Sequence, residues 1–66
     1  MQWVRHDKYA EVSDDGRYSI AAIGTGRGYF FEGYRTRRHE DGLHLVCTNV
    51  TAEEARRLCE EDANGP

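Results

Sequence analysis

The chain has 66 residues, which is enough for one domain spanning residues 1–66 and too few for two. Its 12 acidic and 9 basic residues give a net charge of −3, which excludes the strongly basic surface of proteins that hold nucleic acid mainly by its phosphates. A hydrophobic content of 38% excludes a disordered chain, and two cysteines are too few for a small scaffold held together by disulfides.

The N-terminal segment, residues 1–8, is polar apart from Trp3 and Val4. We expect an irregular or short-strand lead-in, with Trp3 covering one edge of the core. The segment has no apolar signal core, and no stretch of the chain approaches the roughly 18 apolar residues of a membrane span. The expected location is therefore cytoplasmic, without membrane contact.

Two strands, over about 9–13 and 17–23, are predicted on either side of the turn sequence Asp14-Asp15-Gly16. A two-residue loop would place Glu11 opposite Ile20 and mix charged with apolar side chains on one face. A three-residue loop, with Gly16 in the left-handed conformation, separates the two kinds of side chain, so we predict that register. The resulting apolar face consists of Ala10, Val12, Tyr18, Ile20 and Ala22.

A third strand, over about 29–36, follows the glycine-rich segment 24–28. A dinucleotide-binding fingerprint would need a further glycine where Tyr29 stands and a helix directly afterwards, so a hairpin turn is the better interpretation. The aromatic residues of this strand alternate between its two faces. Tyr29 and Phe31 are predicted on one face, and Phe30 and Tyr34 on the other.

A fourth strand is predicted over about 43–48, after a charged loop. Simple alternation along this strand assigns three side chains to each face. The inward set is expected to be Leu43, Leu45 and Cys47. The outward set is expected to be His44, Val46 and Thr48.

The helix over about 52–63 has the clearest local signal. Thr51 is its expected N-cap, and Glu54 completes a capping box in which both side chains satisfy backbone N–H groups of the first turn. Small and apolar residues form one stripe along it: Ala52, Ala55, Leu58, Cys59 and Ala63. Together the elements predict an α+β fold, a small antiparallel sheet of three to four strands packed against one C-terminal helix.

The sequence predicts neither catalysis, nor a metal site, nor a cofactor. His39, His44, Cys47 and Cys59 lack the paired spacing of zinc ligands. A domain of this length also has little volume for a substrate pocket of about 300 Å³ or more, so we expect no enzyme activity. A disulfide between Cys47 and Cys59 would need Cα atoms within about 7 Å, which the sequence leaves open, and a cytoplasmic location favours two reduced thiols.

One helix can cover only one side of a sheet, so the side chains of Phe30 and Tyr34 are predicted to lie on an open face. Arg35 and the loop residues Arg37 and Arg38 are expected around them. An exposed aromatic group ringed by charges is typical of a protein interface. This pattern predicts a non-enzymatic protein-binding module, and a structural homodimer that buries the same face is one alternative.

The segment Arg27–Tyr34 also partly resembles the aromatic signature strand of the RNA-recognition-motif (RRM) family. Its basic, glycine and aromatic positions fit, whereas Phe30 stands at a small position and Glu32 at an apolar one. The resemblance implies that bases stack on the aromatic rings while neighbouring arginines hold phosphates. A small single-stranded nucleic-acid-binding domain is therefore a second alternative.

The exposed side of the helix offers another candidate surface for a partner. Glu53, Glu54, Glu60, Glu61 and Asp62 would oppose a basic partner, although Arg56 and Arg57 interrupt the negative charge. Glu53–Arg57 and Arg56–Glu60 have the i,i+4 spacing of helix ion pairs, which also fits a simple solvated face.

Two motifs, Ser13–Ile20 and Thr51–Cys59, resemble parts of short orphan proteins of bacteriophages and prophages, in which a hairpin leads into a sheet and a helix closes it. That group includes inhibitors of host defence such as anti-CRISPR proteins. The resemblance implies a larger protein or nucleoprotein complex as partner, and inhibition of a bacterial defence (CRISPR-Cas) complex by occlusion of its surface. It assigns no functional residue.

Overall fold

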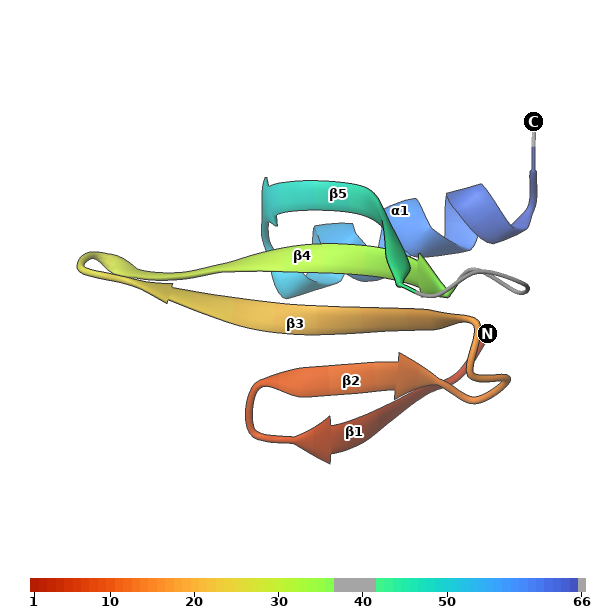
Figure 1. The fold of residues 1–66 in the computed structure, drawn as a ribbon, viewed down its shortest axis with the longest axis horizontal. Helices are drawn as coiled ribbons and strands as arrows, with labels where there is room; N and C mark the ends of the chain where they lie inside the picture. The colour runs from red at the N-terminus through yellow and green to blue at the C-terminus, as the bar shows by residue number, and fades with distance from the viewer. Residues whose placement is uncertain (37–41, 66) are drawn as a thin grey trace.

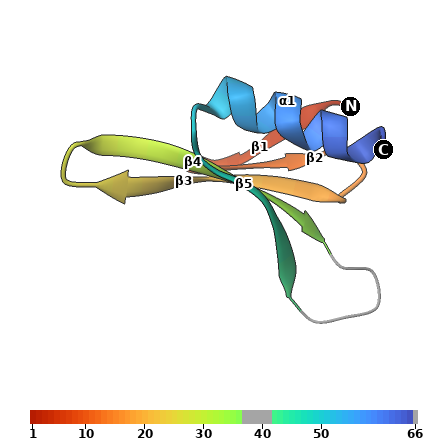
Figure 2. The same cartoon turned by 90° about the horizontal axis from the view of Figure 1, so that it is seen from above.

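The computed structural model of the chain describes residues 1–36 and 42–65 and has an α+β fold (Figure 1). Within these residues, five antiparallel strands form one sheet in chain order: β1 (Trp3–Asp7), β2 (Ala10–Ser13), β3 (Tyr18–Thr25), β4 (Gly28–Thr36) and β5 (Leu43–Val50). The helix α1 (Ala52–Ala63) follows and lies along one face of this sheet (Figure 2). Each strand pairs with its neighbour in the sequence, so the sheet forms from local hairpins alone.

The prediction of three to four strands is wrong by one, because the N-terminal segment is a paired strand. Trp3 lies opposite Ser13 and Val4 opposite Val12 in the β1–β2 ladder. Trp3 packs against the core as expected, and its indole Nε1 donates a hydrogen bond to Glu60 at 3.0 Å. The other strands begin and end within two residues of their predicted bounds, and α1 has the predicted bounds.

The core lies between α1 and the middle strands, and small residues bring the two layers together. Tyr18 and Ile20 of β3 are buried against Ala55 and Cys59 of α1. Directly below the helix stands Gly33 of β4, where a Cβ atom would lie 2.7 Å from the Cys59 Sγ atom. The helix therefore sits so close to the sheet that only glycine fits at this point.

The predicted register of the β2–β3 hairpin is wrong. Glu11 lies opposite Ile20 and Val12 opposite Ser19, which turns Glu11 toward the helix and Val12 away from it. Arg56 of α1 donates hydrogen bonds of 2.9 and 2.6 Å to the two carboxylate oxygens of Glu11. A partner 45 residues along the chain thus makes the charged side chain favourable on the helix side, where alternation alone predicted only apolar residues.

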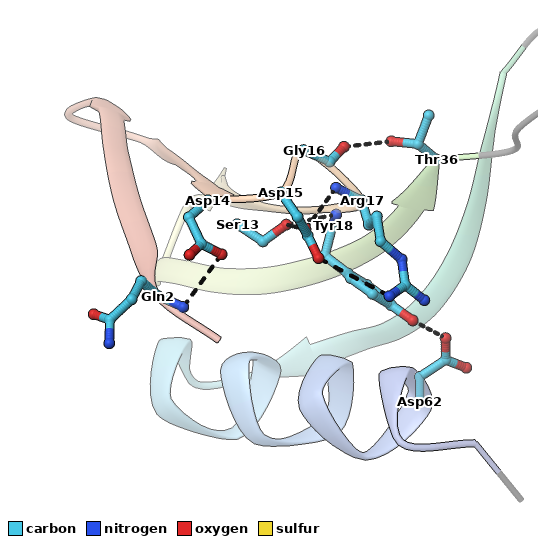
Figure 3. A network of polar contacts seen from close by, with 9 residues as sticks. All are labelled: Gln2, Ser13, Asp14, Asp15, Gly16, Arg17, Tyr18, Thr36 and Asp62. Carbon is cyan, nitrogen blue, oxygen red and sulfur yellow. Dashed lines mark hydrogen bonds and ion pairs between the residues drawn. The ribbon is translucent and has the colours of Figure 1, made fainter.

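A network of side-chain hydrogen bonds in the β2–β3 turn supports this register (Figure 3). The hydroxyl of Ser13 accepts a hydrogen bond from the Tyr18 backbone N–H at 3.0 Å and donates one to Asp15 at 2.7 Å. Gly16 has the predicted left-handed conformation, with φ of 75°. The observed pairing is therefore the one assigned to the two-residue loop and not that of the predicted three-residue loop, and the Ser13 side chain supplies a hydrogen bond to the backbone at the end of the turn.

In β5 the predicted assignment of side chains to the two faces of the sheet is only partly right. Cys47 packs against the core as expected, but so does Val46. Leu43 and Leu45, which were expected to point inward, are 52% and 47% exposed. The prediction for these two leucines is wrong because it assumed an unbroken alternation along the strand.

Two irregularities in the β4–β5 ladder break that alternation. Between the pairs Tyr34–Leu45 and Gly33–Cys47, β5 contains one extra residue, and a second register shift precedes Val50. Near the second shift, Asn49 adopts a left-handed φ of 59°, a conformation that asparagine tolerates better than most residues. These bulges return Cys47 and Val50 to the core while the two leucines stay on the other side.

Candidate functional site

The sheet has two unlike faces, which we call the covered face, on the side of α1, and the open face, on the opposite side (Figure 2). Strand pairing assigns side chains to each, since residues that are paired across a ladder point the same way. One row crosses the open face from edge to edge, and it consists of Val4, Val12, Ser19, Tyr34 and Leu45. Among residues 1–36 and 42–65, nothing packs over this row.

Further pairs extend the open face on either side of that row. Ala21 lies between Ala10 and Glu32, and Ile23 lies opposite Phe30. At the other end Leu43 lies opposite Thr36. The predicted position of Phe30 and Tyr34 on a face away from the helix is therefore found in the structure.

The leucines of β5 and the valine of β1 add the largest exposed apolar groups to this face. Val4 is 57% exposed, more than either Leu43 or Leu45. None of the three appeared among the expected binding residues. The alternation of Trp3 and Val4 was a usable signal for Val4, whereas the bulges that expose the leucines leave no simple pattern in the sequence.

Among the described strand residues, two charged ones lie on the open face: Asp7 at its β1 edge, opposite Ala10, and Glu32 in β4. The Glu32 carboxylate accepts a hydrogen bond from the Thr48 hydroxyl at 2.5 Å and another from the hydroxyl of Tyr34. These two hydrogen bonds lower the pKa of Glu32, and the bond to Glu32 raises the pKa of Tyr34. Neighbouring hydroxyl groups thus already donate hydrogen bonds to the Glu32 carboxylate, so a partner on the open face has fewer donors to supply.

The expectation that Arg35 lies beside these aromatics on the open face is wrong. It pairs with Tyr18 in the β3–β4 ladder and points to the covered face. There its Nη1 atom contacts the Asp62 carboxylate at 2.9 Å, and Tyr18 donates a further hydrogen bond to the same oxygen at 2.6 Å. The loop residues Arg37 and Arg38 lie outside the described part of the chain.

The acidic residues predicted on the helix fall into two groups. Glu53 and Glu61 are exposed, and Arg57 contacts Glu61 at 3.2 Å. Glu60 instead accepts the hydrogen bond from Trp3, and Arg56 is turned inward to β2. The expected helix pairs Glu53–Arg57 and Arg56–Glu60 are therefore replaced by other partners.

On the covered face, a hollow of about 100 Å³ lies between β1, β2 and the first turns of α1. Ile20 and Phe31 line it, together with the ion pair of Glu11 and Arg56. Nearby the rings of Tyr9 and Tyr29 stand 5.8 Å apart. The hollow is smaller than the roughly 300 Å³ of a usual small-molecule site.

The two cysteines are free thiols, and both sulfurs approach the position of Gly33. Burial raises the pKa of Cys59 to about 12, and the nearby Cys47 adds to this shift. A thiol of this kind is a poor nucleophile at neutral pH. In residues 1–36 and 42–65, no group of three histidine, cysteine or acidic side chains is arranged to hold a metal ion.

The helix in the described ranges is too short and too polar to cross a membrane. The sequence matches no protein-family model, and comparisons with curated proteins and with solved structures gave no match.

Proposed function

We propose that this protein is a non-enzymatic binding module that docks onto another protein through the open face of its sheet. The observation that supports this is the mostly apolar row, interrupted only by Ser19, that crosses all five strands with no cover from the described residues. Monomeric proteins seldom leave a continuous apolar surface of this kind in water, and those that do commonly use it for binding.

The composition of the open face favours a protein over a nucleic acid as its partner. Phe30 and Tyr34 would stack bases, but the β4 arginine that was expected beside them, Arg35, is held by Asp62 on the covered face. Phosphate contacts provide most of the affinity for single strands. Without a cation from β4, the face is better suited to apolar side chains.

The resemblance to small phage proteins extends this proposal to a biological role. We propose inhibition of a larger bacterial complex, such as a CRISPR-Cas effector, by covering a surface that the complex needs. The exposed carboxylates of Glu53 and Glu61 on α1 provide a second, acidic surface for such a partner. No chemistry by the protein itself is required for occlusion.

The proposal is tested by comparing substitutions on the two faces of the sheet. Tyr34→Ala removes a ring from the open face, and Tyr29→Ala removes a 61% exposed ring from the other face as a matched control. A partner isolated with the wild-type protein and then purified should bind Tyr34→Ala at least about tenfold more weakly and Tyr29→Ala equally well.

Two results would contradict it. Equal loss of affinity in both variants would remove the open face as the docking surface. Saturable binding of the pure protein to single-stranded oligonucleotides, with affinity that falls steeply as salt increases, would support the nucleic-acid alternative instead.

A further inference from the structure

The open face is uneven in the size of its side chains, and this unevenness has a direction. On β4 and β5 it carries large residues, which we call the bulky half: Phe30, Tyr34, Leu43 and Leu45. On β1 to β3 it carries mostly smaller ones, which we call the small half: Val4, Ala10, Val12, Ser19 and Ala21, with Ile23 as the one large residue beside them. One side of the face is therefore raised relative to the other.

A surface that is raised on one side and low on the other is complementary to its own copy. Consider a two-fold axis that runs parallel to the strands, between two facing sheets. It places β1 of one copy over β5 of the other, and β2 over β4, at both ends of the interface. Each bulky half then packs on a small half, which allows the close interdigitation that apolar packing requires.

The charge on the face permits the same arrangement. Glu32 lies on β4, so the two-fold axis places it over β2 of the second copy, near Val12 and Ala10, and not over the other Glu32. Its carboxylate keeps the hydrogen bonds from Thr48 and Tyr34. Asp7 of β1, the ladder partner of Ala10, lies at the edge of the same face and accepts a hydrogen bond from the Tyr9 backbone N–H at 2.7 Å, so each carboxylate enters the interface with a hydrogen-bond partner of its own.

The dimensions of the molecule allow a stable dimer. Its two longer axes measure 35 and 23 Å, and Figure 1 shows the sheet spread in that plane. A rectangle of that size covers about 800 Å², the area that each partner contributes to a standard protein interface, and since it encloses the whole molecule it is the upper limit for the sheet face.

The small size of the hydrophobic core also favours a dimer. The side chains buried in the core are those of only a few hydrophobic residues: Tyr18, Ile20, Ala55 and Cys59. A chain of this length buries about 60% of its unfolded surface and commonly gains stability from association. A second copy is present whenever the protein is, and it offers a sheet of the same twist.

From these observations we propose that the partner of the open face is a second copy of this chain, packed sheet to sheet as a symmetric two-layer sandwich with the helices outside. This inference rests on the proposed function in one respect, the use of the open face for protein docking. The resulting dimer displays one acidic helix surface, with Glu53 and Glu61, on each of its two outer sides.

Sedimentation equilibrium or light scattering tests the dimer directly. Over about 10 to 500 μM we expect the mass to approach twice the 7.6 kDa of the chain. Val4→Arg and Leu45→Glu should each weaken the dimer at least tenfold, because each puts a charge against an apolar side chain in both symmetric contacts. Tyr29→Ala, on the covered side, should leave the mass unchanged.

An equimolar mixture of the two charge variants distinguishes the proposed packing from any other dimer. With β1 over β5, the mixed dimer contains one contact between the new arginine and the new glutamate and one wild-type contact, so the dimer mass should return. Val4 and Leu45 are about half exposed in the single chain, so both variants should keep the wild-type circular dichroism spectrum.

A monomer at the highest concentration overturns the second-copy inference but leaves open-face binding to a different protein intact. A dimer that forms in both variants separately, or that the mixture does not restore, also overturns it, because association would then use another surface. The proposed function fails separately, when open-face substitutions leave the affinity for a purified partner unchanged.

Discussion

The two faces of this sheet differ in how their side chains are covered. On the covered face, polar side chains from the strands reach the helix: Trp3 contacts Glu60, Glu11 contacts Arg56, and Tyr18 and Arg35 contact Asp62. Between these contacts the residues are small, and the layers touch. On the open face most residues are apolar, larger on β4 and β5 than on β1 and β2, and the described chain supplies nothing to cover them.

The difference shows that internal stability and binding capacity reside on separate surfaces of a very small domain. The covered face is specific, because each polar contact fixes the helix in one position. The open face has only shape and apolar area to offer, which suits an external partner. Substitutions should therefore act on unfolding when they lie on one face and on association when they lie on the other.

The largest effect on stability is expected for Gly33→Ala. The added methyl group would lie 2.7 Å from the Cys59 Sγ atom and 2.9 Å from the Cys47 Sγ atom, so the helix must move outward. We expect a loss of about 1–3 kcal/mol in the free energy of unfolding, measured by thermal or urea denaturation. Gly26→Ala is the matched control, because its methyl group meets no atom within 4 Å.

A compensating substitution sharpens this prediction. Cys59→Ala removes the sulfur that the new methyl group meets, so Gly33→Ala should be less harmful in that background than in the wild type. Equal losses in the two backgrounds would mean that close contact with the helix is not the reason for glycine at this position.

The N-cap of the helix should contribute the next largest effect. The Thr51 hydroxyl accepts a hydrogen bond from the Glu54 backbone N–H at 3.1 Å, which Thr51→Ala removes. The expected loss is about 1 kcal/mol in the free energy of unfolding, whereas Thr51→Ser keeps the hydroxyl and should stay close to wild type. If neither substitution changed the free energy of unfolding, packing on the sheet alone would determine where the helix begins.

Acid should destabilise the covered face through Glu11 and Asp62. Hydrogen bonds from Arg56 to Glu11 and from Tyr18 to Asp62 hold the pKa of each carboxyl below its ordinary value, 4.5 and 3.8 respectively. The folded state therefore binds fewer protons, so this stabilisation is complete above about pH 4.5 and is lost as the pH falls through the lowered pKa values. Melting temperatures measured from neutral pH downward should show the decline.

Glu11→Gln should reduce both the stability at neutral pH and the steepness of that decline. The loss at neutral pH should be about 0.5–1 kcal/mol, since the charged pair is partly exposed and water screens it. Glu32→Gln is the comparison from the open face, where the carboxylate meets only its own strand neighbours. If Glu32→Gln changed the dependence of the melting temperature on pH as much as Glu11→Gln, the contact between Glu11 and the helix would not be the cause of the acid sensitivity.

The smallest effect on the stability of the single chain is expected on the open face. Leu43→Ser removes an apolar side chain that is half exposed and has no cover, so unfolding at low protein concentration should change by no more than about 0.5 kcal/mol. At high concentration the same variant should lose the additional stability that association provides. A large loss at low concentration would mean that the open face belongs to the core of the monomer.

The sequence predicted the helix and most strand positions because their signals are local. The N-cap at Thr51, the turn at Gly16 and the aromatic alternation of β4 each depend on residues only a few positions apart. The sequence prediction failed for Glu11 because a distant group, Arg56, makes the helix side favourable for it, whereas Arg35 simply follows the alternation of β4, which puts it on the face opposite that of Tyr34. The prediction also failed in β5, because alternation does not reveal where a bulge interrupts a strand.

Composition and local pattern alone therefore determined the α+β class, four of the five strands, the helix with its N-cap and the existence of an uncovered aromatic side. The tertiary structure decided which residues share that side, because a one-residue change in register exchanges the two faces of a strand. Pairing energies between distant charges, and two bulges in one strand, fixed that register. The structure places Val4, Leu43 and Leu45 on the open face and Arg35 on the covered face. The surface predicted to combine aromatics with arginines is therefore mostly apolar.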